Sequence, residues 1–111
     1  MAQSVGACGV EVHAAHGYLL DQFLWHGSNV RDDGYGGPDI THRARFPAEI
    51  VAAIRAACGP QFLISLRFSQ WKEVDFTARV APSPADLATM ASLFRDAGVD
   101  VLHASTRRFW E

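Results

Sequence analysis

The sequence predicts an α/β protein built on parallel strands. Three short apolar segments, at residues 9–15, 62–69 and 99–106, show the alternation that is typical of strands. Two longer segments between them carry apolar residues at helical spacing. Strands that alternate with helices form βαβ units, whose strands run parallel with right-handed crossovers. The predicted order is therefore strand, long loop, helix, strand, loop, helix, strand.

The composition is that of one small globular domain. The 111 residues are 49% hydrophobic and 20% charged, with a net charge of −2. The interspersed acids and bases argue against nucleic acid or a membrane as partner. No segment approaches the roughly 20 apolar residues of a membrane span, and the N-terminus lacks the pattern of a signal peptide. Cys8 and Cys58 form no motif, so we expect a reduced cytoplasmic protein with unpaired thiols.

The first predicted strand, GVEVHAA at residues 9–15, has two distinct faces. Val10 and Val12 alternate with Glu11 and His13. Because successive side chains of a strand point to opposite faces, the valines should face the helices. His13 should then lie on the opposite face, close to the end of the strand.

The other two strands also become polar toward their C-terminal ends. In FLISLRFS (62–69) one face ends in Arg67, and VDVLHAST (99–106) turns polar at His103 and Ser105. The opposite face of the second strand is wholly apolar, with Phe62, Ile64, Leu66 and Phe68. The C-terminal ends of parallel strands are where doubly wound sheets and (β/α)₈ barrels hold their sites.

Capping signals delimit the two predicted helices. Pro47 suits the first turn of one helix, and Gly59 suits its end. Ser83 is the expected N-cap of the other, with Pro84 as its first residue and Gly98 as its stop. The apolar stripes are Phe46, Ile50, Val51, Ile54 and Cys58 in the first helix, and Leu87, Met90, Ala91 and Phe94 in the second.

Three strands and two helices make an incomplete layer. A (β/α)₈ barrel needs about 250 residues, and both ends of this chain fall in mid-pattern. We therefore expect residues 1–111 to form an incomplete domain. Its open sheet edges would favour a homo-oligomer or association with partner strands.

The stretch HAAHGY places His13, His16 and Tyr18 at the end of the first strand. A zinc site needs three or four ligands. His26 or His103 could be recruited, but no cysteine pair and no HExxH motif supports that reading, and structural hydrogen bonding stays open. Another use fits better: two neutral imidazoles can direct N–H donors at one carbonyl oxygen. A tyrosine hydroxyl ionises at about pH 10, so it stays protonated at neutral pH and can donate a proton.

Several segments together resemble the Old Yellow Enzyme family of FMN-dependent oxidoreductases. They are GVEVHAAHGYLLDQF, SNVRDDGYGG, RARF and ISLRFS, which span essentially the whole chain. RFSQWK and HASTRRFW are similar to one bacterial subgroup of that family.

The resemblance implies a (β/α)₈ barrel with FMN across its C-terminal mouth, of which this chain supplies about strands four to six. By resemblance His13 and His16 bind the carbonyl oxygen of the substrate, and Tyr18 is the proton donor. Arg67 lies against the N1/O2 side of the flavin, and His13 also contacts the cofactor.

The long loop after the first strand carries further matches. We interpret Gly36-Gly37 as a backbone turn and Arg31 with Asp33 as an ion pair that fixes the loop. Arg43 and Arg45 are expected to anchor the start of the following helix. Further matches are Asn29 and Tyr35, and His42 stands where the family commonly has Asn. Trp71 and Lys72 follow the second strand and either overhang the substrate or lie on a surface loop.

These expectations combine into a function. In the complete enzyme NAD(P)H would reduce FMN, and hydride would pass to an activated alkene such as an enone. Two alternatives stay open. One is a truncated, non-catalytic remnant or partner-dependent module, because most of the family's flavin contacts lie outside these residues. The other is a metal-dependent hydrolase, for which the sequence lacks a third well-placed ligand.

Overall fold

A computed structural model describes residues 3–70, 79–81 and 83–105. It contains a single sheet of three parallel strands in the order β1, β2, β3. Their bounds are Gly9–Ala14 for β1, Leu63–Phe68 for β2 and Val101–Ala104 for β3. The predicted α/β class and the parallel strand direction are therefore confirmed.

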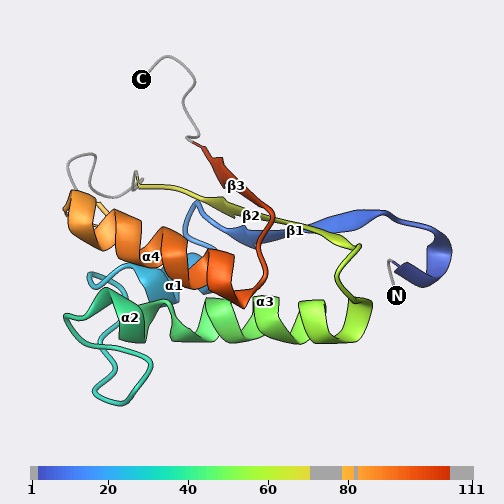
Figure 1. The fold of residues 1–111 in the computed structure, drawn as a ribbon. Coiled ribbons are helices and arrows are strands. Elements are labelled where there is room, and N and C mark those ends of the chain that lie inside the picture. The colour runs from blue at the N-terminus through green and yellow to red at the C-terminus, as the bar shows by residue number, and fades with distance from the viewer. Residues whose placement is uncertain (1–2, 71–78, 82, 106–111) are drawn as a thin grey trace.

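Four α-helices lie along one face of the sheet (Figure 1). They are α1 (Leu19–Leu24), α2 (Ile40–Arg43), α3 (Arg45–Cys58) and α4 (Pro84–Ala97), and a short 3₁₀ turn at Gln3–Val5 precedes β1. No helix of the described residues covers the opposite face, which we call the open face (Figure 1). The described helices therefore leave this face of the sheet uncovered.

The two long helices begin and end where the sequence predicts. Pro47 lies in the first turn of α3, and Gly59 ends that helix with a φ of 86°. The Ser83 hydroxyl accepts a hydrogen bond from the backbone N–H of Asp86 and so caps α4. Gly98 ends α4 with a φ of 123°, a backbone conformation that glycine adopts without steric cost.

Helices α1 and α2 replace part of what the sequence predicts as one long loop. Helix α1 has six residues and no side-chain cap at Tyr18, so it lacks the usual start signal. Its buried Leu20 and Leu24 join the core, which shows that packing rather than capping stabilises this helix. Helix α2 has four residues, and the Asp39 carboxylate caps it by accepting from the Thr41 N–H.

The hydrophobic core lies between the sheet and the helices, and the predicted strand faces are confirmed. Val12 on β1 is buried whereas Glu11 and His13 are exposed. Ile64 and Leu66 on β2 are fully buried. They pack in one cluster with helix residues that include Val51, Met90 and Phe94. All four side chains of β3 are exposed, so this strand forms one edge of the described sheet.

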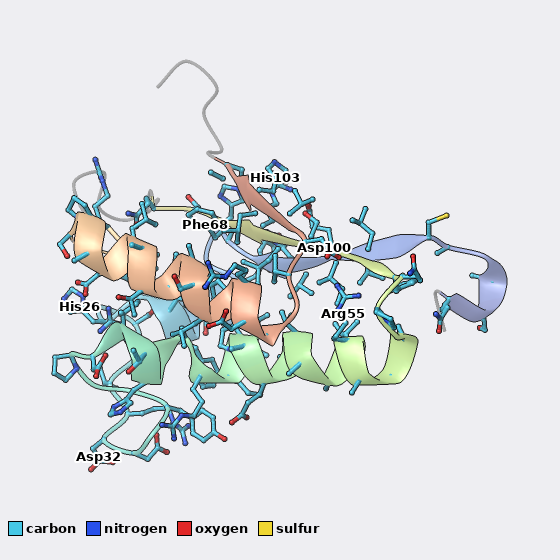
Figure 2. All side chains as sticks on the ribbon, in the orientation of Figure 1. His26, Asp32, Arg55, Phe68, Asp100 and His103 are labelled. Carbon is cyan, nitrogen blue, oxygen red and sulfur yellow. The ribbon has the colours of Figure 1, made fainter. Side chains whose placement is uncertain are left out.

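An ion pair joins the helices to the sheet at the N-terminal ends of β2 and β3. Arg55 on α3 lies 2.7 Å from the Asp100 carboxylate, and Figure 2 shows the two side chains together. Arg55 also donates to the carbonyl oxygens of Phe62 and Gly98, and Asp100 accepts from the N–H of Ile64. This end of the sheet is therefore held by charge-assisted hydrogen bonds.

A carboxamide closes the connection between β2 and α4. The Gln70 side chain donates to the Ala81 carbonyl oxygen at 2.9 Å and accepts from the Ala81 N–H at 2.7 Å. Two hydrogen bonds of this kind fix both position and orientation. The backbone at Ala81 therefore stays beside the end of β2.

Candidate functional site

Strand register brings three of the polar residues into one row across the open face. His13 pairs with Arg67, and Arg67 pairs with His103. Paired residues of a parallel sheet project to the same side. The row therefore places an imidazole on each side of a guanidinium, near the C-terminal ends of the strands.

A tight turn after β1 brings His16 to the same end of the sheet. His16 adopts a φ of 58° and Gly17 a φ of 81°, and a positive φ is uncommon for a residue other than glycine. Two side chains of α1 hold this turn: the buried Asp21 carboxylate accepts from the Gly17 N–H, and Gln22 donates to the Gly17 carbonyl oxygen. The orientation of His16 is thus fixed by α1, which the sequence prediction missed.

The three residues of the HAAHGY stretch come together. The ring centroids of His13 and Tyr18 are 4.8 Å apart, and those of His13 and His16 are 5.9 Å apart. Tyr18 is 60% exposed, so its hydroxyl is accessible from solvent. Two imidazoles and a phenol therefore share one end of the open face.

Ser105 joins this group, and sequence reasoning assigned it no role in the site. Its hydroxyl oxygen lies 2.9 Å from Nε2 of His16 and accepts a hydrogen bond of 3.0 Å from Nε of Arg67. The backbone N–H of Ser105 donates to the Phe68 carbonyl oxygen, which holds it beside β2. Strand alternation combined with the register would have placed Ser105 at the site, because it follows His103 by two residues and so faces the same side of the sheet.

A second polar cluster lies one row nearer the beginning of the strands. The Glu11 carboxylate accepts from the Ser65 hydroxyl and lies 2.9 Å from Nδ1 of His103. The hydrogen bonds to His103 and Ser65 lower the pKa of Glu11 from its usual value. Figure 2 shows His103 on the open face and His26 on the helix side of the sheet. The two histidines considered for a metal site therefore lie on opposite sides.

Among the residues that the structure describes, no three His, Cys, Asp or Glu side chains are arranged so that they could hold a metal ion. No described helix has the length and apolar character needed to cross a membrane.

The model of the NADH:flavin oxidoreductase / NADH oxidase family matches residues 1–109. The chain belongs to this family. This confirms the resemblance to Old Yellow Enzymes that the sequence motifs indicate. The family folds as a (β/α)₈ barrel, and the three parallel strands with helices on one face are consistent with part of such a barrel.

Several curated proteins are similar to this family member. An NADH oxidase of Thermoanaerobacter brockii is 40% identical over 97 residues, which are 87% of this chain and 14% of the relative. The NADH-dependent flavin oxidoreductase iliE of Neonectria sp. is 39% identical over 109 residues, 98% of this chain and 13% of the relative. A cinnamate reductase of Clostridium sporogenes is 49% identical over 70 residues, 62% of this chain and 10% of the relative. The chain thus spans a small part of these relatives.

The loop that carries the family's SNxRxDxYGG pattern is held by its own side chains. Asn29 donates to the carbonyl oxygens of Phe23 and Tyr35. A Cβ added at Gly36 would come within 2.5 Å of the Arg31 carbonyl oxygen, and Gly37 has a φ of 100°. The predicted turn at the two glycines is therefore confirmed. Gly36 lets the Arg31 backbone approach closely, and Gly37 adopts a left-handed backbone conformation.

The predicted ion pair of Arg31 and Asp33 is also present in this family loop. The Asp33 carboxylate accepts from the Tyr35 N–H as well, and these bonds lower its pKa. Figure 2 shows the neighbouring Asp32 on this loop, well away from the sheet. The loop contacts therefore stabilise its own backbone rather than the candidate site.

The two predicted anchors of α3 differ in their surroundings. Arg43 is buried and donates to backbone carbonyl oxygens, whereas Arg45 is exposed, with its guanidinium 5.7 Å from the centroid of the Tyr35 ring. His42, where the family commonly has Asn, lies on α2 and is half-buried. Trp71 and Lys72 lie outside the described residues.

Proposed function

We propose that this chain supplies the substrate-binding part of an FMN-dependent NAD(P)H oxidoreductase of the ene-reductase type. The observation that carries the proposal is the grouping of His13, His16 and Tyr18 beside Arg67 at the C-terminal end of a parallel sheet. We assign the three strands to about the fourth, fifth and sixth of the family's barrel. The free thiols of Cys8 and Cys58 suit the reducing cytoplasm.

His13 and His16 bind the carbonyl oxygen of the substrate. Their N–H groups stabilise the negative charge that develops on this oxygen as the conjugated double bond is reduced. Tyr18 lies next to His13, and its exposed hydroxyl donates the proton to the α-carbon.

The donors on the open face suit a flavin. Arg67 presents a permanent cation and His13 a further hydrogen-bond donor, and both fit the electron-rich edge of the flavin ring. FMN, when bound there and reduced by NAD(P)H, would supply the hydride for the β-carbon of the alkene. Arg67 would stabilise negative charge on that ring and thereby raise its reduction potential.

The names of the relatives support an activated alkene as substrate. One relative is named for the reduction of cinnamate, an unsaturated acid. Another, a chanoclavine-I aldehyde reductase of Penicillium roqueforti, is 33% identical over 97% of this chain. We therefore propose a small molecule whose double bond is conjugated to a carbonyl group.

A module that does no catalysis by itself is the second candidate. The observation in its favour is the open face, where Leu63 and Val101 are 49% and 46% exposed. In a barrel these side chains would meet layers from other strands. Under this alternative the chain works only in association with partner strands.

A chimeric barrel tests the proposal. The chain replaces the matching segment of the Thermoanaerobacter brockii relative, and the chimera is loaded with FMN. His13→Ala and His16→Ala should slow alkene reduction by about 10²–10³-fold and weaken phenol binding. Ser65→Ala, a change on the same face away from the proposed clamp, is the control. If both histidine variants reduce the alkene as fast as the control does, the proposal is wrong.

A further inference from the structure

Ser105 is the point at which three separate parts of the chain meet. It follows β3, whereas His16 belongs to the turn after β1 and Arg67 to β2. Both of these side chains direct a nitrogen at the same Ser105 hydroxyl oxygen, at 2.9 Å and 3.0 Å. Removal of this one oxygen would therefore take one hydrogen-bond partner from each of two residues of the candidate site.

The hydrogen-bonding capacity of the three groups fixes the direction of one of these two hydrogen bonds. A guanidinium can only donate, so the Ser105 oxygen accepts from Nε of Arg67. A hydroxyl that accepts from a cation is polarised and becomes a better donor. It retains one O–H, and the nearest partner is Nε2 of His16. When the Ser105 hydroxyl donates to Nε2 of His16, this nitrogen is the acceptor and the ring proton lies on Nδ1.

We propose that Ser105 is a positioning residue whose hydroxyl links Arg67 to His16, fixing the tautomer of His16 and the direction of the Arg67 guanidinium. The backbone of Ser105 is suited to this, because its N–H is bonded to the Phe68 carbonyl oxygen. On the other side of the link, His16 lies in a turn with a strained, positive φ. The buried Asp21 carboxylate holds this turn by accepting a hydrogen bond from the Gly17 N–H. The consequence for substrate binding rests on the proposed function, whereas the link itself does not.

Nitrogen NMR of the histidine rings in the 111-residue chain tests the link directly. In the wild type the Nε2 resonance of His16 should be that of an unprotonated acceptor. Ser105→Ala should shift the tautomer equilibrium of His16, and Ser105→Thr, which keeps the hydroxyl, should restore it. Ser65→Ala is the matched control and should leave the His16 resonances unchanged. Unchanged His16 resonances in Ser105→Ala would overturn the proposal.

A double-mutant cycle shows whether Arg67 affects His16 through Ser105. Arg67→Met should shift the Nε2 resonance of His16 when Ser105 is present and leave it unshifted in the Ser105→Ala background. Equal shifts in both backgrounds would mean that Arg67 acts on His16 directly, which overturns the proposal. Should a variant of the isolated chain fail to fold, the same four proteins are compared in the chimeric barrel.

Phenol binding to the FMN-loaded chimera separates this inference from the proposed function. Ser105→Ala should weaken phenol binding about fivefold to tenfold, the equivalent of one hydrogen bond, and Ser105→Thr should restore it. Tighter binding in Ser105→Ala would mean that the serine competes with the ligand, and would overturn the positioning role. If the NMR results hold and the wild-type chimera binds no phenol, the proposed function fails and the link stands.

Discussion

Nε of Arg43 on α2 donates a hydrogen bond of 2.8 Å to the carbonyl oxygen of Leu24, at the end of α1. The same guanidinium donates to the carbonyl oxygens of Gly37 and Val80. Arg43 is only 2% exposed, and this burial lowers the pKa of its guanidinium. One buried side chain thus joins a helix end, the long loop and the segment that precedes α4.

Replacing Arg43 should destabilise the fold strongly. Arg43→Met keeps much of the side-chain volume but leaves buried carbonyl oxygens without their donor. We expect a loss of about 3 kcal/mol in the free energy of unfolding, measured by urea denaturation. The control is Arg45→Met at an exposed position two residues away, which should cost less than about 1 kcal/mol. Equal losses for the two variants would contradict the anchoring role of Arg43.

The ion pair of Arg55 and Asp100 should make stability depend on pH. The hydrogen bond from the Ile64 N–H and that from Arg55 lower the pKa of Asp100 in the folded protein. Because its pKa is lower in the folded protein, the Asp100 carboxylate stabilises the fold at pH values above its unfolded pKa, which is about 3.9. This stability is lost as the pH falls through the pKa of the folded state.

The comparison of Asp100→Asn with the wild type isolates this contribution. The difference in unfolding free energy should be present at about pH 7 and should disappear toward about pH 2. It is measured by urea denaturation across that range. Asp96→Asn is the control, because Asp96 is an exposed carboxylate that meets Arg95 at the surface. A difference for Asp100→Asn that persists unchanged in acid would rule out this linkage.

Tyr18→Phe should separate the two half-reactions of the chimeric enzyme. The variant lacks the proposed proton donor, so alkene reduction should slow by about 10²–10⁴-fold. Reduction of the flavin by NAD(P)H needs no proton from this residue and should change much less. Rapid-mixing measurements of each half-reaction test this, with Tyr35→Phe in the remote loop as the control. Equal losses in both half-reactions would exclude the proton-donor role.

Arg67→Leu should lower the reduction potential of the bound flavin. The reduced ring carries negative charge, and the variant removes the neighbouring cation that stabilises it. Arg67→Lys keeps the charge and should restore most of the potential. Equilibrium titration against a reference dye measures both variants. An unchanged potential with flavin still bound would show that Arg67 does not meet the ring.

The isolated 111-residue chain should bind FMN weakly or not at all. In the described sheet, β1 and β3 each pair with β2 alone, so each leaves one edge of backbone groups without a strand. Several apolar side chains on the sheet are also exposed. Flavin fluorescence and calorimetry test this expectation. A tight one-to-one complex from a monomer would contradict it.

The strands and long helices were predictable because each carries its own local signal. The alternation of β2 places Leu66 inward and Arg67 outward, and Ser83 and Gly98 delimit α4 through caps that depend only on neighbouring residues. Helix α1 has no such cap. It forms because Leu20 and Leu24 enter a core built from distant segments, which no local pattern reveals.

The candidate site was predictable in its residue types but not in its contacts. His13 and Tyr18 are close in sequence, so their proximity follows from the turn between them. The bonds of Ser105 to His16 and Arg67 span 89 and 38 residues, and they depend on strand register. A single sequence does not define register across βαβ units, because helix length and crossover geometry set it together.

The two hydrogen bonds between Gln70 and Ala81 have a consequence for how such a protein can diversify. They fasten the two ends of the stretch between Gln70 and Ala81, so β2 and the residues that lead into α4 keep their places relative to each other. That stretch follows the strand end that carries Arg67. Selection, or an engineer grafting segments between relatives, could therefore use Gln70 and Ala81 as fixed junctions without rebuilding the scaffold.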